Sequence, residues 1–222
     1  MNRYTKKIIL IISIPLIFTA CSRVDFLSTS YATSISLLSD YFDESGQIYN
    51  RELIDGIPFA SSLITFNNRS KSLIILETIN EKESIWISRD NIRFKEMDGR
   101  INQTIGLPND LYSIERPVLS FQEILDKKKV NYVSYYSFRK PKLNNLKVEI
   151  ISEVVGLQEV KILENEMELV LIKERIYASK INWKKDNLYW IDPKTYFSWK
   201  SIQHLSPKLP PLTIEVTKKP AY

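Results

Sequence analysis

Short apolar runs alternate with polar turn residues along most of the chain. From about residue 57, polar clusters separate apolar runs that lie at residues 63–66, 73–76, 85–87 and 92–94. Strands spaced about ten residues apart and joined by tight turns predict an antiparallel meander. Asp98 and Gly99 mark a hairpin in this series, because both residues tolerate the positive φ that such turns require.

The strand pattern resumes after a less regular stretch at residues 106–130. Apolar runs predict further strands at residues 132–138, 147–155, 160–163, 167–177, 180–183, 188–191, 197–202 and 213–216. Helical spacing of apolar residues predicts one short helix over residues 29–43 and a second over residues 120–129, with Phe121, Ile124 and Leu125 facing inward. The fold class predicted is mainly β, an antiparallel meander that forms a sandwich or an open barrel with one or two short helices.

Three consecutive lysines, Lys127, Lys128 and Lys129, end the second predicted helix. Cations near a helix C-terminus interact favourably with the helix dipole, so a solvated helix end is the first interpretation. A glycan-binding or lipid-binding patch is the alternative.

The first 21 residues follow a different pattern. A basic start with Arg3, Lys6 and Lys7 precedes an apolar run at residues 8–18 and ends at Cys21. This order is typical of a secretory signal peptide, and the run is too short for a membrane span. The segment 18–21, Phe-Thr-Ala-Cys, resembles the lipobox of bacterial lipoproteins, in which the cysteine is acylated. An ordinary signal peptide with a chance cysteine is the alternative.

This start predicts the organisation of the chain. Residues 1–20 form a lipoprotein signal peptide, residues 21–28 a lipidated tether, and residues 29–222 a single mainly β domain. No later apolar segment is long enough to span a membrane, so we expect a soluble body anchored in the membrane through acyl chains on Cys21. Ser22 follows the cysteine, and under the sorting rule of enteric bacteria it predicts an outer-membrane location facing the periplasm.

Removal of the signal segment also changes the charge. The full chain has 31 basic and 26 acidic residues, and the signal segment holds three of the basic ones. The mature body therefore carries a net charge of +2. A nearly neutral body argues against nucleic acid as a partner, because nucleic-acid binding needs a basic surface. Cys21 is the only cysteine, so the core is held without disulfides.

Two blocks of residues carry a resemblance to a known family. They contain Pro58, Trp86, Gly99, Arg100, Thr104 and Gly106, and then Trp190, Asp192, Trp199, Ser201 and Gln203. Together with the lipobox, these blocks resemble the YjbF/GfcB family of bacterial lipoproteins. The resemblance implies a largely β, periplasm-facing outer-membrane lipoprotein that is encoded with machinery for capsule or exopolysaccharide production and has no enzymatic activity. Asn91 and Tyr196 occupy positions where the family pattern has a turn glycine.

These residues also have structural interpretations. Trp86, Trp190 and Trp199 lie on apolar strands, where core packing is the usual role. Gly99 suits a hairpin turn. Arg100 is suited to pair with a carboxylate, and Asp192 to cap its own turn through side-chain to backbone bonds.

Candidate catalytic chemistry is sparse. His204 is the only histidine, so two-histidine metal sites and Cys/His sites are excluded, and no Gly-x-Ser-x-Gly elbow accompanies it. We interpret His204 as a structural or surface residue in preference to a catalytic one. Glu164, Glu166 and Glu168 supply carboxylates of the kind that glycoside hydrolysis needs, but they lie in a charged, turn-like run. We expect no cofactor, no metal and no enzymatic activity.

The sequence favours an accessory lipoprotein in polysaccharide assembly or export. Direct glycan contact through exposed aromatic side chains is one hypothesis, with Tyr135, Tyr136, Tyr189 and Tyr196 as the candidates. The alternative is a module that docks to export-machinery proteins without touching glycan, for which an unpaired edge strand would be suited. A purely structural envelope lipoprotein is a third interpretation, and a glycan-cleaving enzyme is the least favoured.

Overall fold

The computed structural model describes residue 38 and residues 47–67, 71–80, 83–115, 117, 119–140 and 142–221. The signal segment, Cys21, the tether and all of the predicted helix over residues 29–43 except Leu38 lie outside these described residues. Leu38 itself is buried in the main hydrophobic cluster. Within the described part of the chain, no helix is both long enough and apolar enough to cross a membrane.

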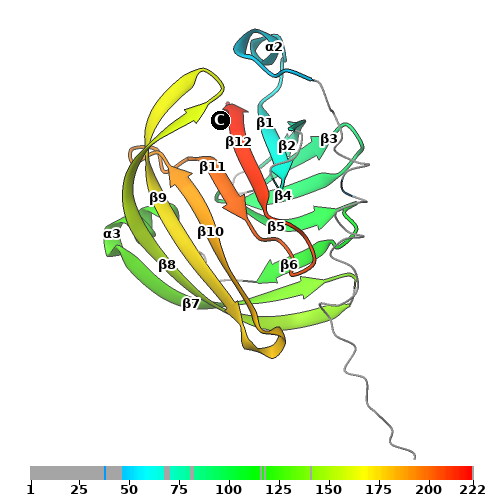
Figure 1. Ribbon diagram of the computed structural model, residues 1–222, viewed down its shortest axis with the longest axis vertical. Coiled ribbons are helices and arrows are strands. Elements are labelled where there is room, and N and C mark those ends of the chain that lie inside the picture. The colour runs from blue at the N-terminus through cyan, green and yellow to red at the C-terminus, as the bar shows by residue number, and fades with distance from the viewer. Residues whose placement is uncertain are drawn as a thin grey trace, which may run out of the picture.

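The described residues form one antiparallel sheet of 12 strands (Figure 1). The strands are β1 (Ser61–Phe66), β2 (Ser72–Ile79), β3 (Glu83–Ser88), β4 (Arg93–Met97), β5 (Arg100–Ile105), β6 (Leu111–Glu115), β7 (Lys129–Phe138), β8 (Leu143–Ile162), β9 (Asn165–Ala178), β10 (Trp183–Ile191), β11 (Ser198–Gln203) and β12 (Leu212–Lys218). One meander runs from β1 to β5 and a second from β6 to β12. They are joined by the pairing of β1 with β12, so that β5 and β6 become the two edges.

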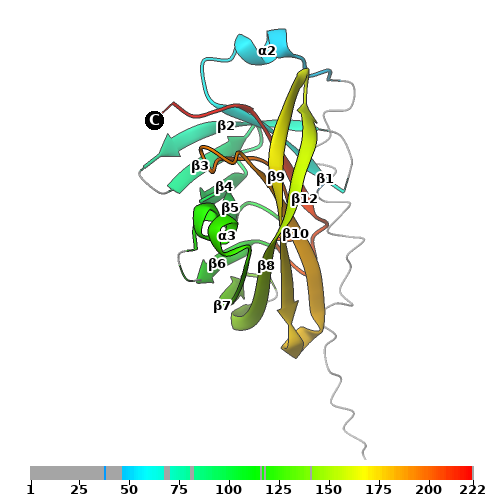
Figure 2. The same cartoon turned by 90° about the vertical axis from the view of Figure 1, so that its left-hand side faces the viewer.

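The sheet curls into a nearly closed, barrel-like shape, which confirms the predicted mainly β fold. The two edges, β5 and β6, follow each other in the chain and are linked by the loop at residues 106–110. The β8–β9 hairpin extends beyond the rest of the sheet (Figures 1 and 2).

Two short α-helices and one 3-10 helix accompany the sheet in the described residues. They are α2 (Arg51–Asp55), α3 (Phe121–Lys127) and η1 (Ser179–Ile181). α3 confirms the predicted second helix and begins with a capping box. The Ser120 hydroxyl accepts a hydrogen bond from the Glu123 amide at 3.2 Å, and the Glu123 carboxylate accepts one from the Ser120 amide at 3.0 Å. α2 was not predicted, since five residues are too few to show a 3.6-residue period.

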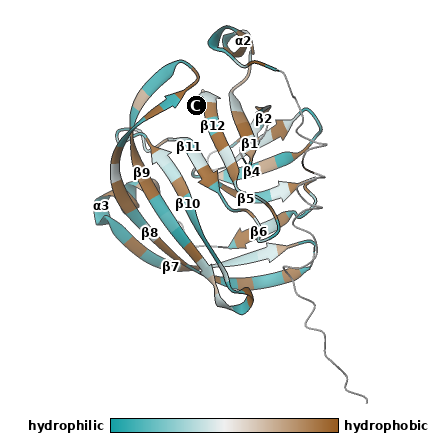
Figure 3. Ribbon diagram, in the orientation of Figure 1, coloured by the Kyte–Doolittle hydropathy of each residue, from teal (hydrophilic) through white to brown (hydrophobic). Residues whose placement is uncertain are grey.

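Bands of hydrophobic and hydrophilic residues follow one another along the strands (Figure 3). Successive side chains of a strand point to opposite faces of the sheet, and the buried hydrophobic ones form the core. The main cluster contains Phe94, Val148 and Trp183. The Trp183 ring packs against the rings of Tyr136 and Phe138, with centroids 6.0 and 6.4 Å apart.

A separate cluster forms along the β8–β9 hairpin. Val160, Ile162 and Leu169 are buried there against the half-buried rings of Trp190 and Trp199. The Trp190 indole N–H also donates to the Gln158 side chain at 2.8 Å. Both tryptophans therefore attach the hairpin to the sheet.

Three predicted strand boundaries are wrong. The strands predicted at 147–155 and 160–163 are one 20-residue strand, β8, because a bulge between Val154 and Gly156 lets the ladder to β9 continue. Residues 157–159 of β8 are all exposed, so the alternation of buried and exposed positions stops there. The segment predicted as a strand at 180–183 contains the end of η1, the cap residue Asn182 and the first residue of β10. The less regular stretch at 106–130 contains the strand β6.

Gly99 lies at the hairpin turn between β4 and β5 that the sequence predicted. Asp98 and Gly99 have φ values of 49° and 70°. A Cβ atom on Gly99 would lie 2.6 Å from the Ser198 Cβ and 3.0 Å from the Phe121 ring. The position therefore requires glycine both for its backbone conformation and for the close packing of three segments.

We expect Gly99→Ala to lower the free energy of unfolding by about 2–4 kcal/mol, since it adds left-handed strain to overpacking. Urea denaturation measures this loss. Adding Ser198→Gly should recover the part of this stability loss that comes from overpacking. Gly56→Ala is the matched control, because Gly56 has φ −69° and its added Cβ meets no atom closer than 3.5 Å. Equal losses in the two alanine variants would contradict this account.

Candidate functional site

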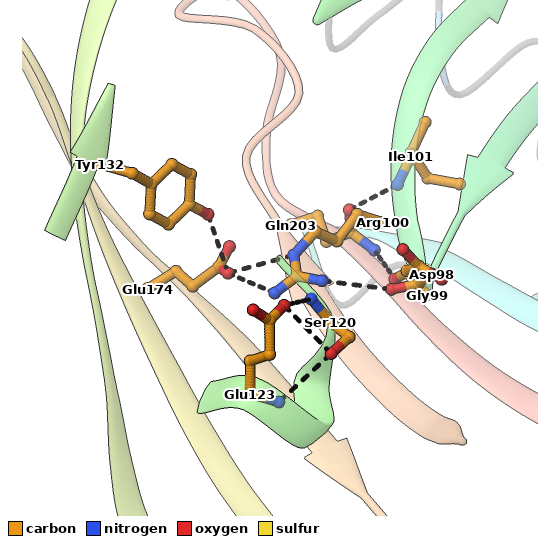
Figure 4. A network of polar contacts seen from close by, with 9 residues as sticks. All are labelled: Asp98, Gly99, Arg100, Ile101, Ser120, Glu123, Tyr132, Glu174 and Gln203. Carbon is orange, nitrogen blue, oxygen red and sulfur yellow. Dashed lines mark hydrogen bonds and ion pairs between the residues drawn. The ribbon is translucent and has the colours of Figure 1, made fainter. Parts of the chain in front are cut away.

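Arg100, the first residue of β5, forms a buried ion pair with Glu174 of β9 (Figure 4). Arg100 Nη2 and Nε both donate to Glu174 Oε1, at 2.6 and 3.1 Å. Each side chain is only 3% exposed. The pair connects the edge strand β5 to a strand on the opposite part of the curled sheet.

Other groups around the pair compensate for its burial. The Arg100 guanidinium lies 3.9 Å from the centroid of the Phe121 ring and 5.2 Å from that of Tyr189, so two aromatic faces contact the cation. The Tyr132 hydroxyl donates to Glu174 Oε1 at 3.2 Å. Burial is the largest single influence and lowers the pKa of Arg100, but the charge and hydrogen bond of Glu174 together with Tyr132 and Tyr189 raise this pKa above its usual value. Arg100 is therefore a permanent cation in the interior.

The Gln203 side chain takes the place of a missing strand beside β5. Its Oε1 accepts from the Ile101 amide at 2.9 Å, while its Nε2 donates to the Gly99 carbonyl at 3.1 Å and to the Ser201 hydroxyl at 2.9 Å (Figure 4). A carboxamide carries one acceptor and one donor group, as a backbone peptide does. Gln203, which lies on β11, thus satisfies edge groups of β5 across the interior.

Thr104 joins the two edges of the sheet. Its hydroxyl donates to Asp110 at 3.0 Å and accepts from the Leu111 amide, the first of β6, at 2.9 Å. The Asp110 carboxylate also accepts from the amides of Gly106 and Leu107. These bonds fix the loop at residues 106–110, and Gly106 has a φ of 102° within it.

His204 lies beside this network and is mostly buried. Its backbone amide donates to the Asn187 side-chain oxygen at 2.8 Å, and its Nδ1 is 3.3 Å from the same oxygen. Burial lowers the pKa of His204 to about 4, with the nearby Lys185 charge acting in the same direction. The internal cavity that Arg100, Glu174 and His204 line measures about 10 Å³. It is far smaller than the cavities of about 300–1,000 Å³ that bind small ligands.

Two of the four candidate contact tyrosines were predicted wrongly as exposed. Tyr136 is 4% exposed and Tyr189 is 1% exposed, and both rings belong to the interior. Tyr135, the neighbour of Tyr136 on β7, is 43% exposed. Aromatic residues occur on both faces of these strands, so the sequence pattern alone does not show which face is inside.

A groove of about 750 Å³ lies on the outer face of β7, β8, β9 and β10. Strand register places Val133, Glu149, Tyr177 and Lys184 side by side in one row across the four strands. A second row behind it contains Asn131, Ile151, Arg175 and Asp186. The groove thus has an apolar, aromatic floor with hydrogen-bonding and charged groups beside it.

Tyr177 is the central ring of this groove, and sequence reasoning missed it. It is 38% exposed and lies directly between Glu149 and Lys184. Its signal in the sequence was its alternation with the buried residues Ile176 and Ala178 at the end of a strand. Tyr135 lies on the same outer face, one row further along, beside Lys147.

Tyr196 is in a different place. It lies in the turn between β10 and β11 with a φ of 60°. The Asp192 side chain caps this turn by accepting from the Lys194 and Thr195 amides at 2.7 and 3.1 Å. Tyr196 lines a separate pocket of about 410 Å³ together with Glu96, whose pKa is raised by burial. Tyr135 and Tyr196 therefore belong to two separate surfaces.

The described residues contain no group of three or more histidine, cysteine, aspartate or glutamate side chains placed to hold a metal ion.

The lysine run at the end of α3 is partly neutralised. Lys127 lies 3.9 Å from Glu123, and Lys129 lies 3.6 Å from Glu153.

Comparison with known proteins places this fold among bacterial lipoproteins. A family model described as group 4 capsule polysaccharide lipoprotein GfcB, YjbF, matches residues 36–217. The chain is 20% identical over 162 residues to the uncharacterised lipoprotein GfcB of Escherichia coli K12, covering 69% of this chain and 73% of that protein. The crystal structure of the hypothetical lipoprotein YmcC from Escherichia coli K12 superposes with a TM-score of 0.63 at 18% identity, covering 86% of this chain and 98% of that one.

We expect Arg100→Met to lower the free energy of unfolding by about 3–5 kcal/mol, because it leaves the Glu174 carboxylate buried without its cation. Replacing both residues, in Arg100→Met/Glu174→Met, should recover most of the loss. Arg93→Met is the control. Arg93 also binds a carboxylate with two nitrogens, each 2.8 Å from Glu77, but on the surface, so a much smaller effect is expected. Additive losses in the double variant would show that the two side chains do not act as a pair.

His204 predicts a loss of stability in mild acid. The unfolded chain protonates this histidine below about pH 6.5, whereas the folded chain does so only near pH 4. Between these values the unfolded state binds more protons, so the free energy of unfolding falls as pH falls. Urea unfolding at pH 7 and pH 4.5 should show a smaller acid loss for His204→Gln than for the wild type. Parallel pH profiles would refute this role.

Proposed function

The chain belongs to the YjbF family of group 4 capsule polysaccharide lipoproteins, and we propose that it is a non-enzymatic accessory factor in capsule or exopolysaccharide assembly or export. In this proposal the outer-face groove of β7–β10 contacts the polysaccharide. The protein is anchored through Cys21 in the outer membrane and faces the periplasm. The family supports envelope anchoring and the connection with capsule polysaccharide.

The composition of the groove is the observation that carries the proposal. An exposed tyrosine ring, Tyr177, lies between the Glu149 carboxylate and the Lys184 ammonium group in a groove that aliphatic side chains also line. A sugar ring offers an apolar face to an aromatic side chain and hydroxyl groups to polar neighbours. A mainly apolar floor with a few polar groups that fix orientation is typical of ligand sites. The groove crosses four strands, so its shape suits an extended chain more than a compact ligand.

The inner network supports the non-enzymatic part of the proposal. Arg100 is one of the residues that carry the family resemblance, and Glu174 is its carboxylate partner. Both side chains are buried away from solvent. Gln203, Ser201 and Thr104 bind backbone or side-chain groups of the same sheet. These residues thus have structural partners, and the cavity beside them has no room for a sugar.

Calorimetric titration tests the proposal. Exopolysaccharide purified from the producing cells is titrated into the lipidated protein in detergent. We expect saturable binding, and we expect Tyr177→Ala to weaken it about tenfold, which corresponds to about 1.4 kcal/mol. Phe59→Ala is the matched control, since Phe59 is 53% exposed and lies outside the groove. Near-ultraviolet circular dichroism verifies that both variants are folded.

Absence of any heat at millimolar repeating units would overturn glycan contact and favour the protein-docking alternative. Unchanged surface polysaccharide after deletion of the gene would overturn the accessory role itself.

A further inference from the structure

Positive charge is concentrated on β7 and on the segments that precede and follow it. Residues 127–148 contain seven lysine and arginine residues and no aspartate or glutamate. Near the start of β7, Lys127 and Lys129 have carboxylate partners from other segments. On β8, Lys147 lies 3.0 Å from Glu149. Part of this charge is thus neutralised.

The turn between β7 and β8 keeps its charge. Arg139, Lys140 and Lys142 are exposed, and none of them forms an ion pair with any carboxylate in the described part of the chain. The mature body is nearly neutral overall, so these three cations are a local excess.

A pocket of about 360 Å³ lies at this turn. It is lined by Tyr112, Phe138, Arg139, Lys142 and Asn144. The Arg139 guanidinium lies 5.2 Å from the centroid of the Tyr112 ring, and the Arg139 amide donates to the Asp110 carbonyl at 3.2 Å. Tyr112 is half exposed. The pocket therefore combines two cations, an amide and an aromatic face on a backbone that is fixed to the neighbouring loop.

The turn pocket lies further along β7 than the groove, whose rows of side chains run across the strands. Val133 belongs to the groove and Arg139 to the turn pocket, and exposed Tyr135 lies between them on β7. Six residues of extended strand cover about 20 Å. A polysaccharide chain that leaves the groove along β7 would therefore reach the turn pocket over this distance.

We propose that the polysaccharide carries carboxylate groups, and that Arg139 and Lys142 bind one of them in the pocket beside Tyr112. This inference rests on the proposed function and adds the chemical class of the glycan. A guanidinium binds a carboxylate through two parallel hydrogen bonds, and an ammonium group adds a point charge. The tyrosine ring supplies the contact for the sugar that bears the acid.

The test compares the purified exopolysaccharide with the same material after chemical reduction of its carboxyl groups to alcohols. Both are titrated into the full lipidated protein and into two charge-reversed variants. Lys142→Glu changes the pocket, and Lys161→Glu is the matched control at the far end of β8, where the lysine pairs with Glu166. We expect Lys142→Glu to weaken binding of the native polysaccharide at least tenfold, and Lys161→Glu to change it less than twofold. Raising the salt concentration should weaken wild-type binding, because screening acts on exposed charges.

The outcomes separate the two proposals. If native and reduced polysaccharide bind the wild type equally and Lys142→Glu has no effect, the carboxylate inference is overturned while the groove remains. If neither polysaccharide binds, the proposed function itself fails. If vesicles with anionic lipids bind in a Lys142-dependent manner and the polysaccharide does not, the pocket serves the membrane surface and the inference is overturned.

Discussion

A guanidinium and a carboxylate, Arg100 and Glu174, meet inside the curled sheet, and its closure depends on how they are accommodated. A buried charge is tolerated only when it is paired and hydrogen-bonded. Phe121, which begins α3, covers the cation at 3.9 Å, and Gly99 leaves space for that ring beside Ser198. One ion pair therefore constrains the β4–β5 turn, the position of α3 and the distance between β5 and β9.

The same constraint explains how the sheet ends. A 12-stranded sheet with two edges leaves backbone groups without strand partners. Here the Gln203 amide substitutes for a neighbouring strand at β5, and the Thr104 hydroxyl connects β5 to the first residue of β6. The polar residues of the interior thus hold the two edge strands in place. The side chains on the outer face of β7–β10 take no part in these bonds.

The outer face of β7–β10 differs from the interior in how its charges and aromatic rings are placed. Its charges are mostly paired on the surface, as for Arg175 and Lys173 with Asp186, and its aromatic rings are partly exposed. The fold is shared with a lipoprotein structure that is only 18% identical, so the architecture persists while most side chains differ. The surfaces that we propose for polysaccharide contact, the groove and the β7–β8 turn, both consist of outer side chains of this shared architecture.

The sequence by itself determined the mainly β class, the hairpin at Asp98 and Gly99, helix α3 and the family, because local periodicity, turn chemistry and residue spacing are properties of short segments. It also marked Arg100 as a residue suited to pair with a carboxylate. Only the tertiary structure decided that Glu174 is this partner, that Tyr136 and Tyr189 are inside, and that Tyr177 lies in a groove. The partner is 74 residues away, and the side of a strand that faces inward depends on register across neighbouring strands. A one-residue change of register exchanges the two faces, so no single segment contains that information.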